Sequence, residues 1–154
     1  MPDCLSRRRV SSIVFSYVRG LNARARRLSV REFVVQQRVS LVCLQETKLQ
    51  VVCNDFISET LGPLFDYVFL PSEGLSGGIV VAWRRDLWVV SATDVRSFSV
   101  TIGLRELSSA SGPWRLTAVF GPCSEPGHSL FLQELRDVRT THSGLGPCES
   151  DRVL

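Results

Sequence analysis

An apolar run that stops at a carboxylate is the part of this 154-residue sequence best suited to chemistry. Residues 41–44 are apolar, Gln45 and Glu46 follow at once, and Lys48 is the only lysine among 18 basic residues. The pattern is typical of a buried strand with an acidic group at its carboxyl end, where open α/β sheets place their sites. A single carboxylate at this place suggests a ligand for a hard metal ion. The alternative is an exposed strand-end carboxylate in an ion pair.

The overall composition is that of an ordinary globular protein. Hydrophobic residues make up 44% of the chain and charged residues 21%, which argues against disorder, and the length fits one domain. Apolar stretches such as residues 79–83 are far shorter than a membrane span, and the N-terminus lacks the apolar segment of a secretory signal. The sequence therefore predicts no membrane association.

The five cysteines are odd in number, widely spaced and without a Cys-x-x-Cys pair. This spacing disfavours both a disulfide framework and a zinc site, and it favours a reducing, intracellular compartment. Cys43 lies within the predicted strand, so we expect it to be a small buried apolar residue.

Positive charge is concentrated in the first quarter of the chain. Residues 1–40 hold nine arginines and two acidic residues, whereas the remainder holds nine basic and thirteen acidic residues. This asymmetry suggests a polyanion partner, and Arg24, Arg26, Arg27 and Arg31 could follow a phosphate backbone. The simpler interpretation, which we favour, is that these four side chains form the solvated face of a helix.

The periodicity of apolar residues predicts alternating strands and helices. A strand, a helix and a second strand occupy residues 12–45, which implies a right-handed parallel crossover. A short helix at residues 54–61, capped by Asn54, precedes a strand and a flexible loop at residues 72–78. The strands between residues 79 and 120 are expected to form an antiparallel meander, followed by a helix at 128–140 and the opening of another strand at 151–154. The predicted fold class is α/β, with helices on the outer faces of sheets.

Four segments, in this order, resemble a known family: Val18-Arg-Gly-Leu-Asn22 after a strand, Cys43-Leu-Gln-Glu-Thr-Lys48, Leu75-Ser-Gly-Gly-Ile79 with Trp83, and Val119-Phe-Gly-Pro122. They are similar to the endonuclease/exonuclease/phosphatase superfamily, in particular to the apurinic-type endonuclease domain of plant long-interspersed-element (non-LTR) retrotransposons. The resemblance implies a partial four-layer α/β sandwich, in which two packed mixed sheets are flanked by helices. Residues 12–154 would form the N-terminal portion of such a domain, and residues 1–11 a basic extension.

The resemblance implies Mg²⁺-dependent cleavage of a DNA phosphodiester bond, with the nucleus as the place of work. Glu46 matches the family's metal-binding glutamate. Mg²⁺ prefers hard oxygen ligands, keeps several waters and is held by one or two carboxylates, so a single glutamate is a reasonable anchor. Arg19, Asn22 and Lys48 are the expected contacts to DNA phosphate.

Departures from the family pattern predict that this chain does not cleave DNA by itself. Tyr17 occupies the position of the family's metal-organising asparagine, and Phe120 replaces a tyrosine whose hydroxyl would contact phosphate. The family's later Gly-Asp-Phe-Asn and Asp-His segments have no counterpart before Leu154, which suggests C-terminal truncation. Two other hypotheses remain: a non-catalytic nucleic-acid-binding remnant that uses the arginine-rich first forty residues, and a decayed gene product with no molecular role.

Overall fold

The structure is a computed structural model that describes residues 12–122, 125–143 and 151–153, so the predicted extension at residues 1–11 lies outside the described residues. Its strands and helices are β1 (Ser12–Tyr17), α1 (Arg24–Gln36), β2 (Val39–Gln45), α2 (Asn54–Thr60), β3 (Phe65–Leu70), β4 (Ile79–Arg84), β5 (Trp88–Val95), β6 (Ser99–Glu106), β7 (Trp114–Val119), α3 (Glu125–Ser143) and β8 (Asp151–Val153). No helix of the described part is long and apolar enough to cross a membrane.

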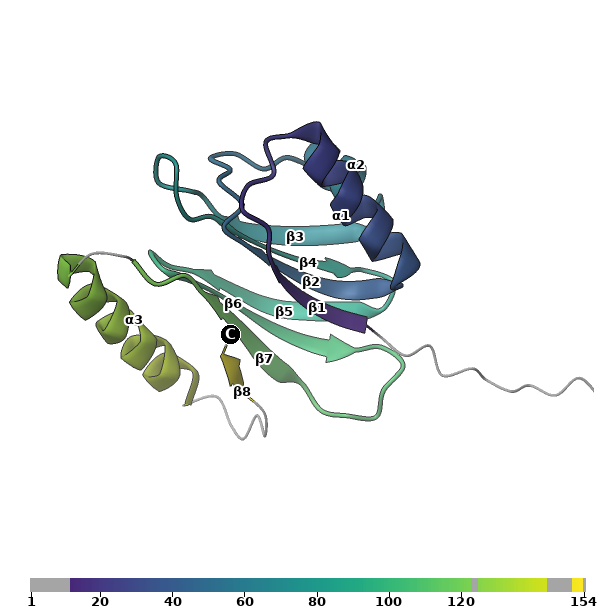
Figure 1. The fold of residues 1–154 in the computed structure, drawn as a ribbon. Helices are drawn as coiled ribbons and strands as arrows, with labels where there is room; N and C mark the ends of the chain where they lie inside the picture. The colour runs from purple at the N-terminus through teal and green to yellow at the C-terminus, as the bar shows by residue number, and fades with distance from the viewer. Residues whose placement is uncertain (1–11, 123–124, 144–150, 154) are drawn as a thin grey trace, which may run out of the picture.

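The strands form two packed sheets of mixed direction. The first has the order β1-β2-β4-β3 and the second the order β5-β6-β7-β8, and in each sheet one pair of neighbours is parallel. Helices α1 and α2 cover the outer face of the first sheet, and α3 lies along the second (Figure 1). The layer order is therefore helix, sheet, sheet, helix, which confirms the predicted fold class.

Strand β2 lies in the interior of the first sheet, between β1 and β4, and five of its seven side chains are apolar. Its alternating side chains enter two cores: Val42 and Leu44 pack under α1 and α2, whereas Leu41 and Cys43 pack between the sheets. Cys43 has no exposed surface, and this burial raises the pKa of its thiol to about 12. The thiol is therefore neutral at physiological pH, as the sequence predicted for a buried apolar cysteine.

The predicted meander between residues 79 and 120 is wrong in one respect, because its strands belong to both sheets. β4 pairs with β2 and β3, whereas β5, β6 and β7 form an antiparallel meander in the second sheet. The turn between β4 and β5 therefore crosses between sheets, and an ion pair of 2.6 Å between Arg84 and Asp86 stabilises it. Alternation of apolar residues identifies half-buried strands, but it does not identify the strands with which they pair.

The predicted cap of the second helix is also wrong. Cys53 is the N-cap residue of α2 and makes no side-chain capping bond, whereas Asn54 is the first helical residue. The Oδ1 atom of Asn54 instead accepts a hydrogen bond of 3.1 Å from the Tyr67 hydroxyl. A partner on a distant strand therefore replaces the local backbone contact on which the capping rule depends.

Candidate functional site

The chain beyond the end of β2, residues 45–48, is held on both sides by backbone hydrogen bonds. The segment 18–21 donates three N–H bonds of 2.7 to 2.9 Å to the carbonyls of residues 45–47. On the opposite side, the N–H groups of Thr47 and Lys48 donate to the carbonyls of residues 78 and 77, at 3.1 and 2.9 Å. The loop at residues 72–78, which the sequence predicted to be flexible, is thus fixed at its C-terminal end.

Glu46 is directed into this junction. Its Oε2 atom accepts a hydrogen bond of 3.0 Å from the Gly77 N–H, and only 7% of the residue is exposed. Its other carboxylate oxygen makes no hydrogen bond or ion pair with any described residue. A backbone donor therefore orients the carboxylate, and one oxygen stays available to a ligand. The ion pair considered in the sequence analysis is not formed within the described residues.

The backbone at the junction is strained. Glu46 and Lys48 have φ angles of +57°, and Arg19 on the adjacent loop has +53°, so all three adopt the left-handed conformation. This conformation costs a residue with a side chain roughly 1–2 kcal/mol. Such strain persists only where the surrounding bonds fix the backbone, and it is most frequent at binding and catalytic sites.

The structure brings the three predicted phosphate contacts to the same junction. Arg19 is exposed and Lys48 is half-buried, and neither makes an ion pair with a described residue. The stem of Lys48 lies against Gly20, since a Cβ atom built on Gly20 would meet its Cδ atom at 3.4 Å. Asn22 uses its amide to hold the loop, because Nδ2 donates to the Lys48 carbonyl at 3.1 Å. The two cations are therefore free to meet an anion.

The arginines of α1 are not simply a solvated face, which corrects the interpretation favoured from the sequence. Arg26 donates to the carbonyls of residues 18 and 19, and Arg27 donates to those of residues 21 and 22. Arg31 donates to the Ser58 carbonyl at 2.7 Å, near the end of α2. Arg24 is exposed and makes one long ion pair of 3.8 Å with Glu59. Three of the four guanidinium groups therefore brace the fold and the loop that carries Arg19.

Two aromatic side chains stand where the resemblance places polar groups. Tyr17 is 58% exposed and is paired in register with Gln45, immediately before Glu46. Phe120 packs over Gly77, where a Cβ atom would meet its ring at 3.5 Å. Both aromatic residues therefore lie beside the backbone that positions Glu46.

The donor set at this junction fits a hard divalent cation only in part. Glu46 supplies one free carboxylate oxygen, and the described residues contain no group of three or more His, Cys, Asp or Glu that could hold a metal. Mg²⁺ often binds through one or two carboxylates together with water and substrate phosphate, so a single glutamate is compatible with this ion. When bound, Mg²⁺ would polarise a phosphoryl oxygen.

Gln45 and Gly77 were not predicted as site residues. Gln45 ties the two sheets together beside the junction, because its Nε2 atom donates to the Val119 carbonyl at 2.8 Å. Gly77 has a φ of +79° and directs its N–H at Glu46. The sequence signals were present: a polar residue that ends an apolar strand, and a Gly-Gly pair that precedes the next strand.

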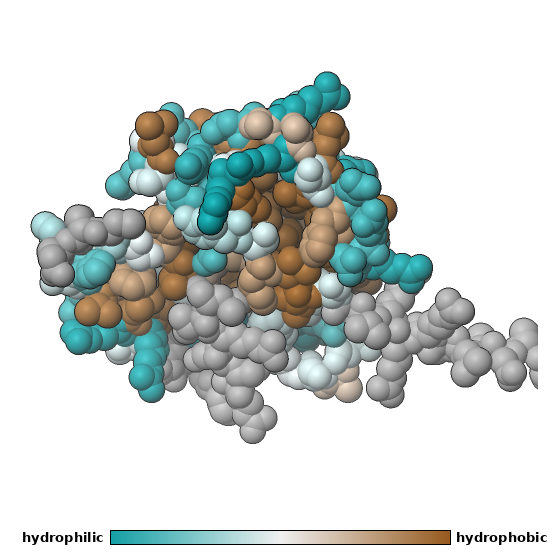
Figure 2. All heavy atoms as spheres, viewed as in Figure 1, coloured by the Kyte–Doolittle hydropathy of each residue, from teal (hydrophilic) through white to brown (hydrophobic). Residues whose placement is uncertain are grey.

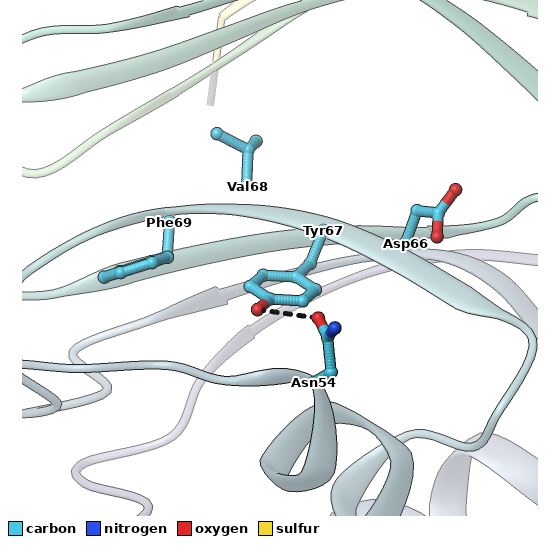
Figure 3. A pocket seen from close by; sticks show the side chains of 5 residues that line it. All are labelled: Asn54, Asp66, Tyr67, Val68 and Phe69. Carbon is cyan, nitrogen blue, oxygen red and sulfur yellow. Dashed lines mark hydrogen bonds between the residues drawn. The ribbon is translucent and has the colours of Figure 1, made fainter.

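A shallow pocket of about 450 Å³ lies elsewhere, along β3 at the far edge of the first sheet. Asn54 and residues 66–69 line it, and the Tyr67 hydroxyl points to the Asn54 side chain (Figure 3). None of the predicted site residues contributes to this pocket.

No protein-family model and no curated protein sequence matches the chain. Solved structures do match. An endonuclease/exonuclease/phosphatase family protein from Bacteroides thetaiotaomicron has a TM-score of 0.63 and 10% identity, over 88% of this chain and 57% of that one. The mannosyl-6-phosphatase Bt3783 of the same organism has the same TM-score and identity, over 88% and 61%. An AP endonuclease from Archaeoglobus fulgidus has a TM-score of 0.60 and 16% identity, over 90% and 53%.

At these identities the likeness concerns the fold alone. The chain spans about half to two-thirds of the length of each of these three structures. Their names include both a phosphatase and a nuclease, so the fold does not decide the substrate. The chain has an α/β fold of two packed sheets with flanking helices, which matches that of endonuclease/exonuclease/phosphatase proteins.

Proposed function

We propose that this chain is a portion of a Mg²⁺-dependent DNA endonuclease domain of the retrotransposon type, and that it binds DNA phosphate without cleaving the strand. The site would be the junction of residues 18–22, 45–48 and 77–78. Glu46 would hold the metal, and Arg19, Asn22 and Lys48 would contact phosphate. The retrotransposon origin depends on the sequence motifs alone.

One observation carries the proposal: an oriented, nearly buried carboxylate shares a backbone junction with two cationic residues, Arg19 and Lys48, that make no ion pair with any described residue. A metal ion neutralises phosphate charge from one side, and Arg19 and Lys48 can neutralise it from the other. The neighbouring backbone is strained at three residues, which is expected where side chains must be held for a ligand.

Tyr17 and Phe120 support the absence of cleavage. Tyr17 has a phenol where the family has the amide of an asparagine, and this side chain is 58% exposed on the edge strand. Phe120 has no hydroxyl where the family has a tyrosine. General acid–base chemistry needs a titratable group within hydrogen-bonding reach of the reacting atoms. We therefore expect DNA binding and neutralisation of the phosphate charge to persist without cleavage of the strand.

DNA binding can be measured by fluorescence anisotropy of a labelled duplex over a series of salt concentrations. The affinity should fall as salt rises, with a slope of about 0.9 for each phosphate contact. Arg19→Ala and Lys48→Ala should each lower that slope by roughly one contact. Arg136→Ala, which removes an exposed arginine of α3 on the outside of the second sheet, is the matched control and should leave the slope unchanged.

Glu46→Ala tests whether DNA binding depends on Mg²⁺ and whether the chain cleaves DNA. Mg²⁺ should strengthen DNA binding by the wild type and not by Glu46→Ala, and neither protein should nick supercoiled plasmid. Binding that is independent of both Mg²⁺ and Glu46 would favour the non-catalytic remnant instead. If the wild type nicks plasmid above the Glu46→Ala level, the expected absence of cleavage is wrong. If the wild type does not bind DNA even at low salt, both the proposed function and the non-catalytic remnant are wrong.

A further inference from the structure

Thr47 lies between two of the proposed site residues, Glu46 and Lys48, but its own side chain is buried. Hydrophilic side chains prevail over the loops at this end of the first sheet in the space-filling view (Figures 1 and 2). Thr47 is polar and yet only 1% exposed, whereas Lys48 is half-buried. Its two neighbours adopt the left-handed conformation, and Thr47 does not. A buried polar residue therefore separates two residues whose side chains would meet the ligand.

The backbone of Thr47 is hydrogen-bonded on both sides. Its N–H donates to the Gly78 carbonyl at 3.1 Å, and its C=O accepts a bond of 2.9 Å from the Leu21 N–H. The backbone of this residue thus joins the loop at residues 18–22 to the loop at residues 72–78. Because the two bonds lead to different segments, a rotation of residues 46–48 about the chain direction would break at least one of them.

The side chain of Thr47 lies against Gly78. A Cβ atom built on Gly78 would meet the Thr47 Oγ1 atom at under 3.0 Å and the Ser72 Cβ atom at 3.5 Å. Oγ1 therefore occupies the space in which any other amino acid at position 78 would carry its side chain. The hydroxyl is buried and has no hydrogen-bond partner among the described residues. Packing, and not a hydrogen bond, therefore accounts for the position of this oxygen.

An oxygen atom fits at this place more closely than a methyl group does. Contacts between a Cα atom and an oxygen are typically about 3.3–3.6 Å, whereas two carbon atoms attract best at about 3.5–4.0 Å. A valine at position 47 would therefore push the Gly78 backbone away by roughly 0.2–0.4 Å. The preceding residue, Gly77, donates its N–H to the Glu46 carboxylate at 3.0 Å. The same displacement would lengthen this bond.

We infer that Thr47 is a positioning residue of this site, because its hydroxyl sets the spacing between segment 45–48 and the glycine pair at 77–78. That spacing keeps the Gly77 N–H on the Glu46 carboxylate, so the free carboxylate oxygen keeps its direction towards a ligand. The consequence for metal and DNA binding rests on the proposed function. The consequence for the Gly77 hydrogen bond does not.

Two substitutions separate the oxygen from the shape of the side chain. Thr47→Val keeps the shape and replaces the oxygen with a methyl group, whereas Thr47→Ser keeps the oxygen. Thr60→Val is the matched control, because Thr60 is 0% exposed and its hydroxyl is also buried without a partner in the described part of the chain, but it lies at the end of α2. Both valine variants remove an unpaired buried hydroxyl, so they share any general effect of that removal on stability.

Hydrogen exchange of the Gly77 amide, measured by NMR without DNA or metal, is the first readout. This amide should exchange roughly tenfold faster in Thr47→Val than in the wild type, because its bond to a charged acceptor is weakened. Its rate should stay at the wild-type value in Thr47→Ser and in Thr60→Val. Cooperative thermal unfolding shows that each variant is folded. Thr47→Ala, which removes the contact without adding a methyl group, takes the place of Thr47→Val if the valine variant is unfolded, with the same expected acceleration.

The gain in DNA affinity on addition of Mg²⁺ is the second readout. Thr47→Val should lose most of this gain, as Glu46→Ala does, whereas Thr47→Ser and Thr60→Val should keep it. The inference is wrong if the Gly77 amide of Thr47→Val exchanges at the wild-type rate, or if Thr47→Ser accelerates it as strongly. A full Mg²⁺ effect in Thr47→Val would also overturn it. If the wild type itself gains nothing from Mg²⁺, the proposed function fails, and the exchange of Gly77 alone decides whether Thr47 positions Glu46.

Discussion

Replacement of Gly78 by alanine should disrupt the junction that holds Glu46. Gly78 accepts the Thr47 N–H bond at 3.1 Å and has a φ of +92°. A Cβ atom at this position would meet the Thr47 hydroxyl oxygen at under 3.0 Å, closer than real Cβ contacts occur, and the Lys48 backbone nitrogen at 3.2 Å. The nitrogen belongs to the backbone, so it cannot rotate out of the way.

Two terms give the expected loss of stability. The positive φ costs a residue with a side chain about 1–2 kcal/mol. The added methyl group in a closely packed place costs about 1–3 kcal/mol more. Together they amount to roughly 2–5 kcal/mol, and each kcal/mol lowers the melting temperature of a domain of this size by about 2–4 °C.

A glycine series separates these terms by urea and thermal unfolding. Gly74→Ala should lose only the stability that the positive φ costs, because Gly74 has a φ of +61° and nothing lies within 4 Å of a built Cβ atom. Gly112→Ala also meets nothing within 4 Å and has no positive φ, so its stability should stay within about 1 kcal/mol of the wild type. In the double variant with Thr47→Ala, part of the Gly78→Ala loss should be recovered, since the Thr47 hydroxyl is buried without a hydrogen-bond partner. The reasoning fails if Gly78→Ala is no less stable than Gly74→Ala.

Two further predictions concern Cys43 and Arg26. Burial raises the pKa of the Cys43 thiol to about 12, whereas the same thiol in the unfolded chain loses its proton near pH 8.5. The thiol therefore makes its full contribution to the free energy of unfolding below about pH 8.5. The free energy of unfolding should fall by about 1.4 kcal/mol per unit as pH rises from roughly 9 towards 12, and urea titrations of Cys43→Ala should lack this part of the decline. Arg26→Gln should loosen the loop at residues 18–22, since it removes a charged donor to the carbonyls of residues 18 and 19. Faster hydrogen exchange of that loop, with a loss of about 1–3 kcal/mol in stability, is the expected result, and unchanged exchange would show that the guanidinium is dispensable.

The sequence was sufficient for the elements and for the position of Glu46, because both depend on local pattern. The apolar run at residues 41–44 predicted a buried strand, and a parallel partner followed from the helix that precedes it. The Gln-Glu pair then had to leave the sheet at its carboxyl end. Local periodicity and one change of polarity therefore located the candidate site.

Long-range pairing accounts for most of what the sequence did not predict. The pairing of β4 with β2 in the first sheet, and the hydrogen bond from the Tyr67 hydroxyl to Asn54, depend on partners more than ten residues away. The sequence pattern of arginines on an amphipathic helix is the same whether their guanidinium groups are solvated or donate to backbone carbonyls. The bond from Arg31 to the end of α2 spans 27 positions and has no signature in the local sequence.

The distribution of backbone strain offers an independent test of the site. Among the described residues, the left-handed conformation occurs without glycine at Arg19, Glu46 and Lys48, and at one position outside the junction, Arg38. Arg38 is exposed and follows the end of α1, where glycine is the preferred residue, so Arg38→Gly should add up to about 1 kcal/mol to the free energy of unfolding and leave DNA binding intact. Lys48→Gly relieves the same strain and should raise stability by a similar amount, but we expect it to weaken DNA binding at low salt. If both variants gain stability and only Lys48→Gly loses affinity for DNA, the Lys48 side chain contributes to DNA binding, and this contribution offsets the cost of its strained backbone. If the two variants bind DNA equally well, the strain has a purely structural origin and the phosphate contact assigned to Lys48 is wrong.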